Sequence, residues 1–123
     1  MALISARLRS NPRFQVAAAD RNKPIGKNEL DKTAVALLQS CLMELGFTLS
    51  RSLKPNGLPD GKFGAETDEA LKSFQRKFSL TPDGMAGPLT LGRMDALYVA
   101  RSAADAAKLN VALNLPRGPW TIS

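Results

Sequence analysis

Residues 60–67 read DGKFGAET, and residues 83–90 read DGMAGPLT. Both copies share the pattern D-G-x-x-G-x-x-T, at an offset of 23 residues from position 60 to position 83. Asp-Gly makes a tight turn because Gly adopts a positive φ without steric cost. A Thr in the first helical turn can bond a backbone group that has no helical partner. The pattern therefore predicts a loop that leads into a helix, used twice.

Three helices are predicted around these loops. Apolar residues three and four positions apart predict a helix at about residues 33–45, with Asp31 or Thr33 as its N-cap. The segment at residues 65–78 has acids in its first turns and bases later, which matches the helix dipole. A third helix is predicted from Pro88, a favoured residue at the first helical position.

The two flanks are less regular. Residues 1–32 show no sustained apolar periodicity, and we expect an extended strap in which Phe14, Val16 and Ile25 pack across the helices. After Tyr98 an Ala-rich run predicts either a fourth helix or an extension of the third, followed by a coil end in which Trp120 is a possible anchor.

Charge divides the chain into the same three parts. Its 123 residues, enough for one domain, carry a formal charge of +6. Residues 1–32 hold seven Lys/Arg and three acids, residues 33–99 hold seven of each, and residues 100–123 hold three and one. We predict a basic N-terminal extension, a helical domain and a C-terminal helix and tail with these bounds. The basic extension is interpreted as a solvated arm, and nucleic-acid binding is disfavoured because dense Lys/Arg runs are lacking.

The composition excludes several kinds of site. The chain has no His and one Cys, which excludes Ser-His-Asp and Cys-His catalysis, imidazole metal sites and an internal disulfide. We expect no catalytic residue, no metal and no cofactor, and we interpret Cys41 as a small, semi-buried apolar residue. An acid–base pair among Glu66, Asp68 and Glu69 is an alternative, but compensation of a helix dipole explains these carboxylates more simply.

Further landmarks accompany the two copies, namely Leu38-Gln39, Leu45-Gly46-Phe47 and Phe74-Gln75. With them, about residues 33–98 resemble the peptidoglycan-binding domain family called PG_binding_1. Two features depart from that family: Ser79 stands where Gly usually precedes Leu80, and the loop at residues 48–59 is long. The resemblance implies an all-α, compact three-helix bundle and a non-catalytic module that recognises bacterial murein.

The resemblance also implies a ligand groove near the two loops and the helix starts. A purely structural role is the alternative for most of the candidates. The Asp and Thr residues can form turns and helix caps, the two Gln residues can hydrogen-bond the loops, and Phe63 can pack in the core. Arg76, like other basic residues near the loops, is either solvated or attracts the carboxylates of murein stem peptides. The candidate groove residues are Gln39, Asp60, Gly61, Phe63, Thr67, Gln75, Arg76, Asp83, Gly84 and Thr90.

We expect a module that binds the glycan or the stem peptide of peptidoglycan and positions itself or a protein partner, such as a hydrolase or an effector, on the cell wall. The alternative is an adaptor that uses the same fold to bind a protein in a secretion or phage-tail assembly. No stretch approaches the ~20 apolar residues of a membrane span. Arg7, Arg9 and Arg13 interrupt the start where a signal peptide has its apolar run. We therefore expect synthesis in the cytoplasm and delivery to the periplasm or wall by a phage or a non-Sec machine.

Overall fold

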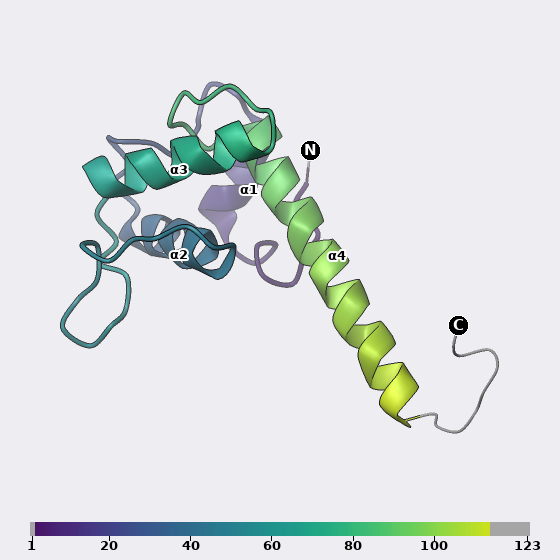
Figure 1. Cartoon of the computed structure of the whole chain (residues 1–123). Helices are drawn as coiled ribbons and strands as arrows, with labels where there is room; N and C mark the ends of the chain where they lie inside the picture. Colours follow the sequence, from purple (N-terminus) through teal and green to yellow (C-terminus); the bar gives the residue numbers. More distant parts are fainter. Residues whose placement is uncertain (1, 114–123) are drawn as a thin grey trace.

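The computed structural model describes residues 2–113, and for side chains residues 2–102. It contains four helices in chain order, α1 Pro12–Ala19, α2 Lys32–Glu44, α3 Ala65–Lys77 and α4 Pro88–Leu113. Figure 1 shows α2 and α3 as neighbours, with α4 running obliquely to them and continuing beyond them. Within the described residues there are no strands, only two isolated bridges, Ile25 with Ala86 and Leu53 with Pro59. The predicted all-α fold is confirmed.

The two central helices begin and end within one residue of their predicted bounds. Asp31 is the N-cap of α2, and its side chain accepts a hydrogen bond from the Ala34 N–H at 3.0 Å. The helix α3 starts after Gly64 with acids in its first turn and Arg76 and Lys77 in its last turn. These charges oppose the partial charges at the two helix ends, as the sequence indicates.

The helix α4 is one continuous element from Pro88 to Leu113. The Ala-rich run after Tyr98 therefore extends the third predicted helix, up to the last described residue. The expected coil end with Trp120 lies outside the described residues. Over the described part of the chain, no helix combines the length and the apolar character that a membrane crossing requires.

A short helix was missed in the N-terminal segment. The side chain of Asn11 accepts a hydrogen bond from the Phe14 N–H at 3.0 Å, and Pro12 occupies the first turn of α1. An Asn N-cap followed by Pro is a regular helix start, so the Asn11-Pro12 dipeptide was the available signal. The expected extended strap is thus corrected: the segment contains the turns at residues 5–10 and the helix α1.

This N-terminal segment is part of the core and not a solvated arm. Leu3, Leu8, Phe14 and Ile25 are all buried, whereas Val16, which we expected to pack, is 43% exposed. Burying each of the larger side chains contributes about 1.5–3 kcal/mol. Residues on both sides of the boundary predicted between residues 32 and 33 therefore belong to one hydrophobic core.

The core joins this segment to all the helices. In the described structure α1 packs against α4, and α2 packs against α3. The ring of Phe74 in α3 lies 5.9 Å from that of Phe47 and 4.8 Å from that of Phe78, measured between centroids. The largest fully buried side chains are Leu8, Phe14, Ile25, Leu38, Gln39, Leu42, Leu49, Leu71, Phe74, Gln75, Leu91 and Met94.

Polar contacts also hold the N-terminus against α2 and α4. The buried carboxylate of Asp95 accepts hydrogen bonds from the backbone N–H groups of Ile4 and Ser5, the latter at 2.8 Å. Arg7 donates to Glu44 at 2.7 and 3.1 Å. Glu44 also accepts a bond from the Tyr98 hydroxyl at 2.6 Å. The Arg7 hydrogen bond is the largest influence on the pKa of Glu44 and, with the Tyr98 bond, lowers it against the opposing effect of burial.

We predict that Glu44→Gln lowers the free energy of unfolding at pH 7 by roughly 0.5–1 kcal/mol, the usual range for a half-exposed pair. Because the folded-state pKa of Glu44 lies below its ordinary 4.5, the pair stabilises the fold above pH 4.5 and loses this effect as the pH falls through the folded value. Urea unfolding at pH 7, 5 and 3 measures the difference, which should shrink toward zero at the lowest pH. A difference that persists at pH 3 would contradict this account. Glu69→Gln, which breaks a looser 3.8 Å pair with Arg76, should cost less at pH 7.

Candidate functional site

The first copy of the repeated pattern is held by one buried amide. Gln39 of α2 donates from Nε2 to Asp60 Oδ1 at 3.1 Å, to the Lys62 carbonyl at 3.0 Å and to Thr67 Oγ1 at 2.9 Å. Its Oε1 accepts a bond from the Gly61 N–H at 3.0 Å. Gln39 and Thr67 are fully buried. The Gln39 side chain therefore connects α2 to the Asp-Gly turn and to the start of α3. We call this set of contacts the first glutamine clamp.

The second copy is held in the same way. Gln75 of α3 donates from Nε2 to Asp83 Oδ1 at 2.9 Å, to the Met85 carbonyl at 3.0 Å and to Thr90 Oγ1 at 3.1 Å. Its Oε1 accepts a bond from the Gly84 N–H at 3.0 Å. This second glutamine clamp fastens the turn and the start of α4. The sequence repeat is thus a repeat of structure, atom for atom.

Each turn uses the Asp and Gly of the pattern for the same task. Asp60 and Asp83 accept a bond from the N–H two residues on, at 2.8 and 2.9 Å. Gly61 and Gly84 both have a φ of +73°, a conformation that L side chains rarely adopt. At Gly61 a Cβ would also lie 2.8 Å from the backbone oxygen of Lys32.

The predicted site residues therefore fall into two clamps and not into one groove. Eight of the ten belong to the clamps. Of the other two, Phe63 is half-buried against the core, and Arg76 is exposed at 3.8 Å from Glu69. The structural interpretation of the two Gln residues as loop-binding is confirmed, while ligand contact by any of the ten stays a prediction.

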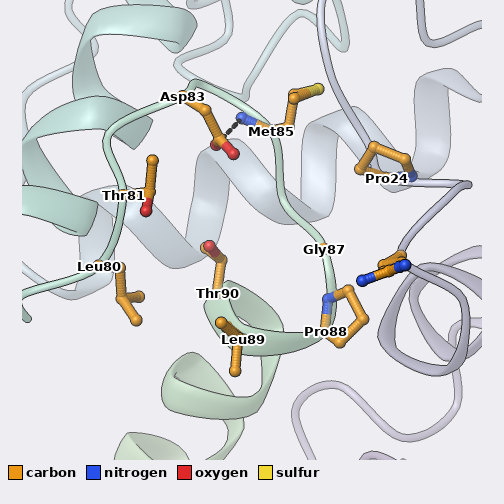
Figure 2. A pocket seen from close by; sticks show the side chains of 10 residues that line it. Pro24, Leu80, Thr81, Asp83, Met85, Gly87, Pro88, Leu89 and Thr90 are labelled. Carbon is orange, nitrogen blue, oxygen red and sulfur yellow. Dashed lines mark hydrogen bonds between the residues drawn. The ribbon is translucent and has the colours of Figure 1, made fainter.

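An apolar pocket of about 430 Å³ lies beside the second clamp. Figure 2 shows Leu80 and Thr81 on the left of it, Pro24 and Pro88 on the right, and Thr90 and Leu89 between them. Of the predicted candidates, Asp83 and Thr90 line it, and Gly84 lines a neighbouring hollow. The residues that line this apolar pocket are Arg21, Pro24, Leu80, Thr81, Asp83, Met85, Gly87, Pro88, Leu89 and Thr90.

The N-terminal segment supplies one wall of the apolar pocket. Ile25 and Ala86 exchange two backbone hydrogen bonds, at 3.1 and 2.8 Å, and so join this segment to the second loop. Arg13 of α1 reinforces the wall by donating to the carbonyl oxygens of Lys23 and Pro24 and to the Glu29 carboxylate, at 2.7–3.0 Å. The pocket therefore has a braced wall that comes from outside the repeat.

A smaller, charged hollow of about 260 Å³ occupies the equivalent place beside the first clamp. There the carboxylate of Glu66 accepts bonds from the Arg51 N–H and the Ser52 hydroxyl, both at 2.8 Å, with Arg51 Nε at 3.4 Å. Burial acts to raise the pKa of Glu66, but these hydrogen bonds outweigh it and the pKa is lowered. The residues that line this charged hollow are Arg51, Ser52, Asp60, Lys62, Gly64, Ala65 and Glu66.

Eight of the ten residues that line the apolar pocket were not predicted as site residues. Met85 and Leu89 occupy variable positions of the pattern where the first copy has Lys62 and Glu66, and both are exposed, by 46% and 78%. Two exposed apolar residues between Asp83 and Thr90 were the available signal. Arg21 and Pro24 belong to the segment that the Ile25–Ala86 bridge joins to the second loop, and no local sequence pattern predicts that bridge.

Two other chemically reactive side chains, those of Asp68 and Cys41, are paired or buried within the fold. Asp68 pairs with Lys72 at 3.0 Å. Cys41 is fully buried, more so than we expected, and burial raises the pKa of its thiol to about 11. Among the described residues no cluster of three metal-ligating side chains occurs.

We predict that Gln75→Leu lowers the free energy of unfolding by at least about 3 kcal/mol, because it leaves the buried Gly84 N–H and Thr90 hydroxyl without their partner. The neighbouring Arg76→Leu changes only an exposed residue and should stay within about 0.5 kcal/mol of the wild type. Denaturant unfolding of both variants measures the two losses. Equal losses would show that the second clamp does not stabilise the fold.

A glycine pair tests the close approach at the first turn. Gly61→Ala should cost about 3 kcal/mol of unfolding free energy, since it adds a backbone clash to an unfavourable φ. Gly57→Ala has a similar φ of +84° but no heavy atom within 4 Å of the added Cβ, so about 1 kcal/mol is expected. The same loss in both variants would mean that the approach to Lys32 carries no cost.

Comparison with known proteins agrees with this geometry. The family model PG_binding_1, described as "Putative peptidoglycan binding domain", matches residues 31–94, just over half of the chain. The match includes both copies of the pattern and both clamp glutamines.

Two curated relatives share this region. The chain is 47% identical over 57 residues to "N-acetylmuramoyl-L-alanine amidase CwlM" of Mycobacterium tuberculosis, a match that covers 46% of this chain and 12% of the relative. It is 40% identical over 72 residues to "Probable N-acetylmuramoyl-L-alanine amidase" of Bacillus licheniformis, covering 58% of this chain and 20% of the relative. The matches thus span a fifth or less of these relatives, and no solved structure matches significantly. From the family match over residues 31–94, the chain belongs to the peptidoglycan-binding domain family.

Proposed function

We propose that this chain is a non-catalytic murein-binding module that positions itself, or a protein partner, on the bacterial cell wall. The observation that carries the proposal is the family match at residues 31–94, within which both glutamine clamps are complete. The relatives named above are amidases of which this region is a small part. A wall hydrolase is therefore one partner that such a module could place on its substrate.

The chemistry of the described residues supports binding over cleavage. Hydrolysis of murein by carboxylates needs an acid and a base that face one substrate. Here Asp60 and Asp83 accept bonds inside the clamps, Glu66 is bound by Ser52 and Arg51, and Asp68 is paired with Lys72. Each of these four carboxylates is thus bound to other groups of the chain, and this supports a binding role over an acid–base role.

The proposed site of action is the periplasm or the cell wall, and the proposed route is a phage or a secretion machine other than Sec. Support for the site of action comes from the family match at residues 31–94. The buried side chains of Leu3, Leu8 and Phe14 make the N-terminal segment part of the folded domain that would reach the wall.

Co-sedimentation with purified insoluble sacculi tests the function directly. We expect the protein in the pellet at low and at high salt, and no soluble muropeptides released during the incubation. Protein that stays in the supernatant under both conditions would refute murein binding. Together with a protein that co-purifies stably, that result would favour the adaptor alternative, and released muropeptides would refute the non-catalytic assignment.

A matched pair of exposed leucines tests whether the apolar pocket is the binding surface. Leu89 lines the pocket and is 78% exposed, whereas Leu30 is 92% exposed and does not line it. We predict that Leu89→Glu weakens binding to sacculi by about tenfold and that Leu30→Glu leaves it unchanged. Both substitutions should leave the melting temperature nearly unaltered because both side chains are exposed. Equal binding by the two variants would place the ligand elsewhere on the module.

A further inference from the structure

The apolar pocket carries an arginine with no acidic partner in the described structure. Arg21 lines the pocket, and no described carboxylate lies within ion-pair distance of it. By contrast, Arg7 and Arg13 in the same segment pair with Glu44 and Glu29. A guanidinium at the edge of an apolar pocket is suited to a ligand carboxylate, which it can bind through two parallel N–H groups.

In the charged hollow beside the first clamp, an arginine also lines the hollow, and there a carboxylate of the chain itself lies next to it. Arg51 lines that hollow, and the Glu66 carboxylate accepts a hydrogen bond from the Arg51 backbone N–H at 2.8 Å and lies 3.4 Å from Nε of the Arg51 guanidinium. Position 89 is the equivalent of position 66 in the repeat, and it is Leu. The apolar pocket thus has an arginine but no carboxylate at the position equivalent to Glu66, which leaves this arginine available to the carboxylate of a ligand.

The other lining residues indicate what accompanies that carboxylate. Pro24, Leu80, Pro88 and Leu89 present aliphatic surface, and none of the described lining residues is aromatic. Flat aromatic faces are the usual platform for sugar rings, whereas aliphatic walls suit small methyl groups. Asp83 adds one negative charge, and both of its described hydrogen bonds go to Oδ1.

We propose that the apolar pocket binds the stem peptide of murein through one of its carboxylates, with Arg21 as the residue that reads this group. Murein stems combine carboxylates with the methyl groups of alanine, which matches one guanidinium and aliphatic walls. The inference rests on the proposed function and deepens it, since it names the part of murein that is recognised. Residue 21 lies outside the family match at residues 31–94, so the N-terminal segment contributes specificity to the module.

Isothermal titration calorimetry with the peptide and the glycan components of murein, used separately, tests the proposal. The probes are stem tetrapeptides released by an amidase and the denuded glycan strands that the same digestion leaves. We expect the intact protein to bind the tetrapeptide and Arg21→Gln to bind it about tenfold or more weakly. Arg9→Gln is the matched control, because it also removes one charge from an exposed arginine in this segment but does not line the pocket. Arg21→Lys, which keeps the charge without the planar fork, should be intermediate.

The possible outcomes distinguish the role of Arg21 and stem recognition from murein binding itself. Equal weakening by Arg21→Gln and Arg9→Gln would overturn the specific role of Arg21, because it would show a long-range charge effect. Binding of denuded glycan and not of the tetrapeptide would overturn stem recognition while leaving murein binding intact. Failure of the wild type to bind sacculi at all would refute the proposed function itself. A tetrapeptide-specific loss confined to Arg21→Gln supports the proposal.

Discussion

One buried amide, used twice, is the contact on which the rest of the fold depends. Gln39 connects α2 to the loop before α3, and α3 then carries Gln75, which connects it to the loop before α4. The two clamps are connected in series, because the helix α3 starts at the first clamp and carries the glutamine of the second. A primary amide suits this task since it offers a donor and an acceptor in one plane. Both amides are fully satisfied, as buried polar groups must be.

This use of the polar residues leaves the variable positions of the pattern to shape the surface beside each clamp. In each copy of the pattern, the Asp, Gly and Thr residues bond to the clamp glutamine or to their own turn. The side chains at the variable positions make none of these bonds, so they can differ between the two copies. At those positions the first copy has Lys62 and Glu66 and the second has Met85 and Leu89. The same backbone device therefore supports one charged hollow closed by its own carboxylate and one open apolar pocket. Duplication of a structural unit has produced two surfaces of different chemistry.

The central helices were predictable from sequence because their signals are local. The Asp31 cap, the charge order of α3 and the repeated turn all lie within a few residues of the structure they specify. The helix α1 is only eight residues long, too short for periodicity to reveal, and only its Asn11-Pro12 start marks it. The wall of the apolar pocket depends on a bridge between residues 25 and 86, and pairing over that separation follows from tertiary packing alone. The site was therefore harder to predict than the fold.

The excess positive charge of the N-terminal segment has separable roles once the fold is known. Arg7 stabilises the contact with α2 through Glu44, and Arg13 braces the loop through Glu29 and two carbonyl groups. These two arginines are used to hold a basic segment against a core region whose own formal charge is zero over residues 33–99. Arg21 differs because it lines the apolar pocket and pairs with no described carboxylate. A net charge summed over the segment hides this difference, since the sum counts an ion-paired arginine and an unpaired one alike.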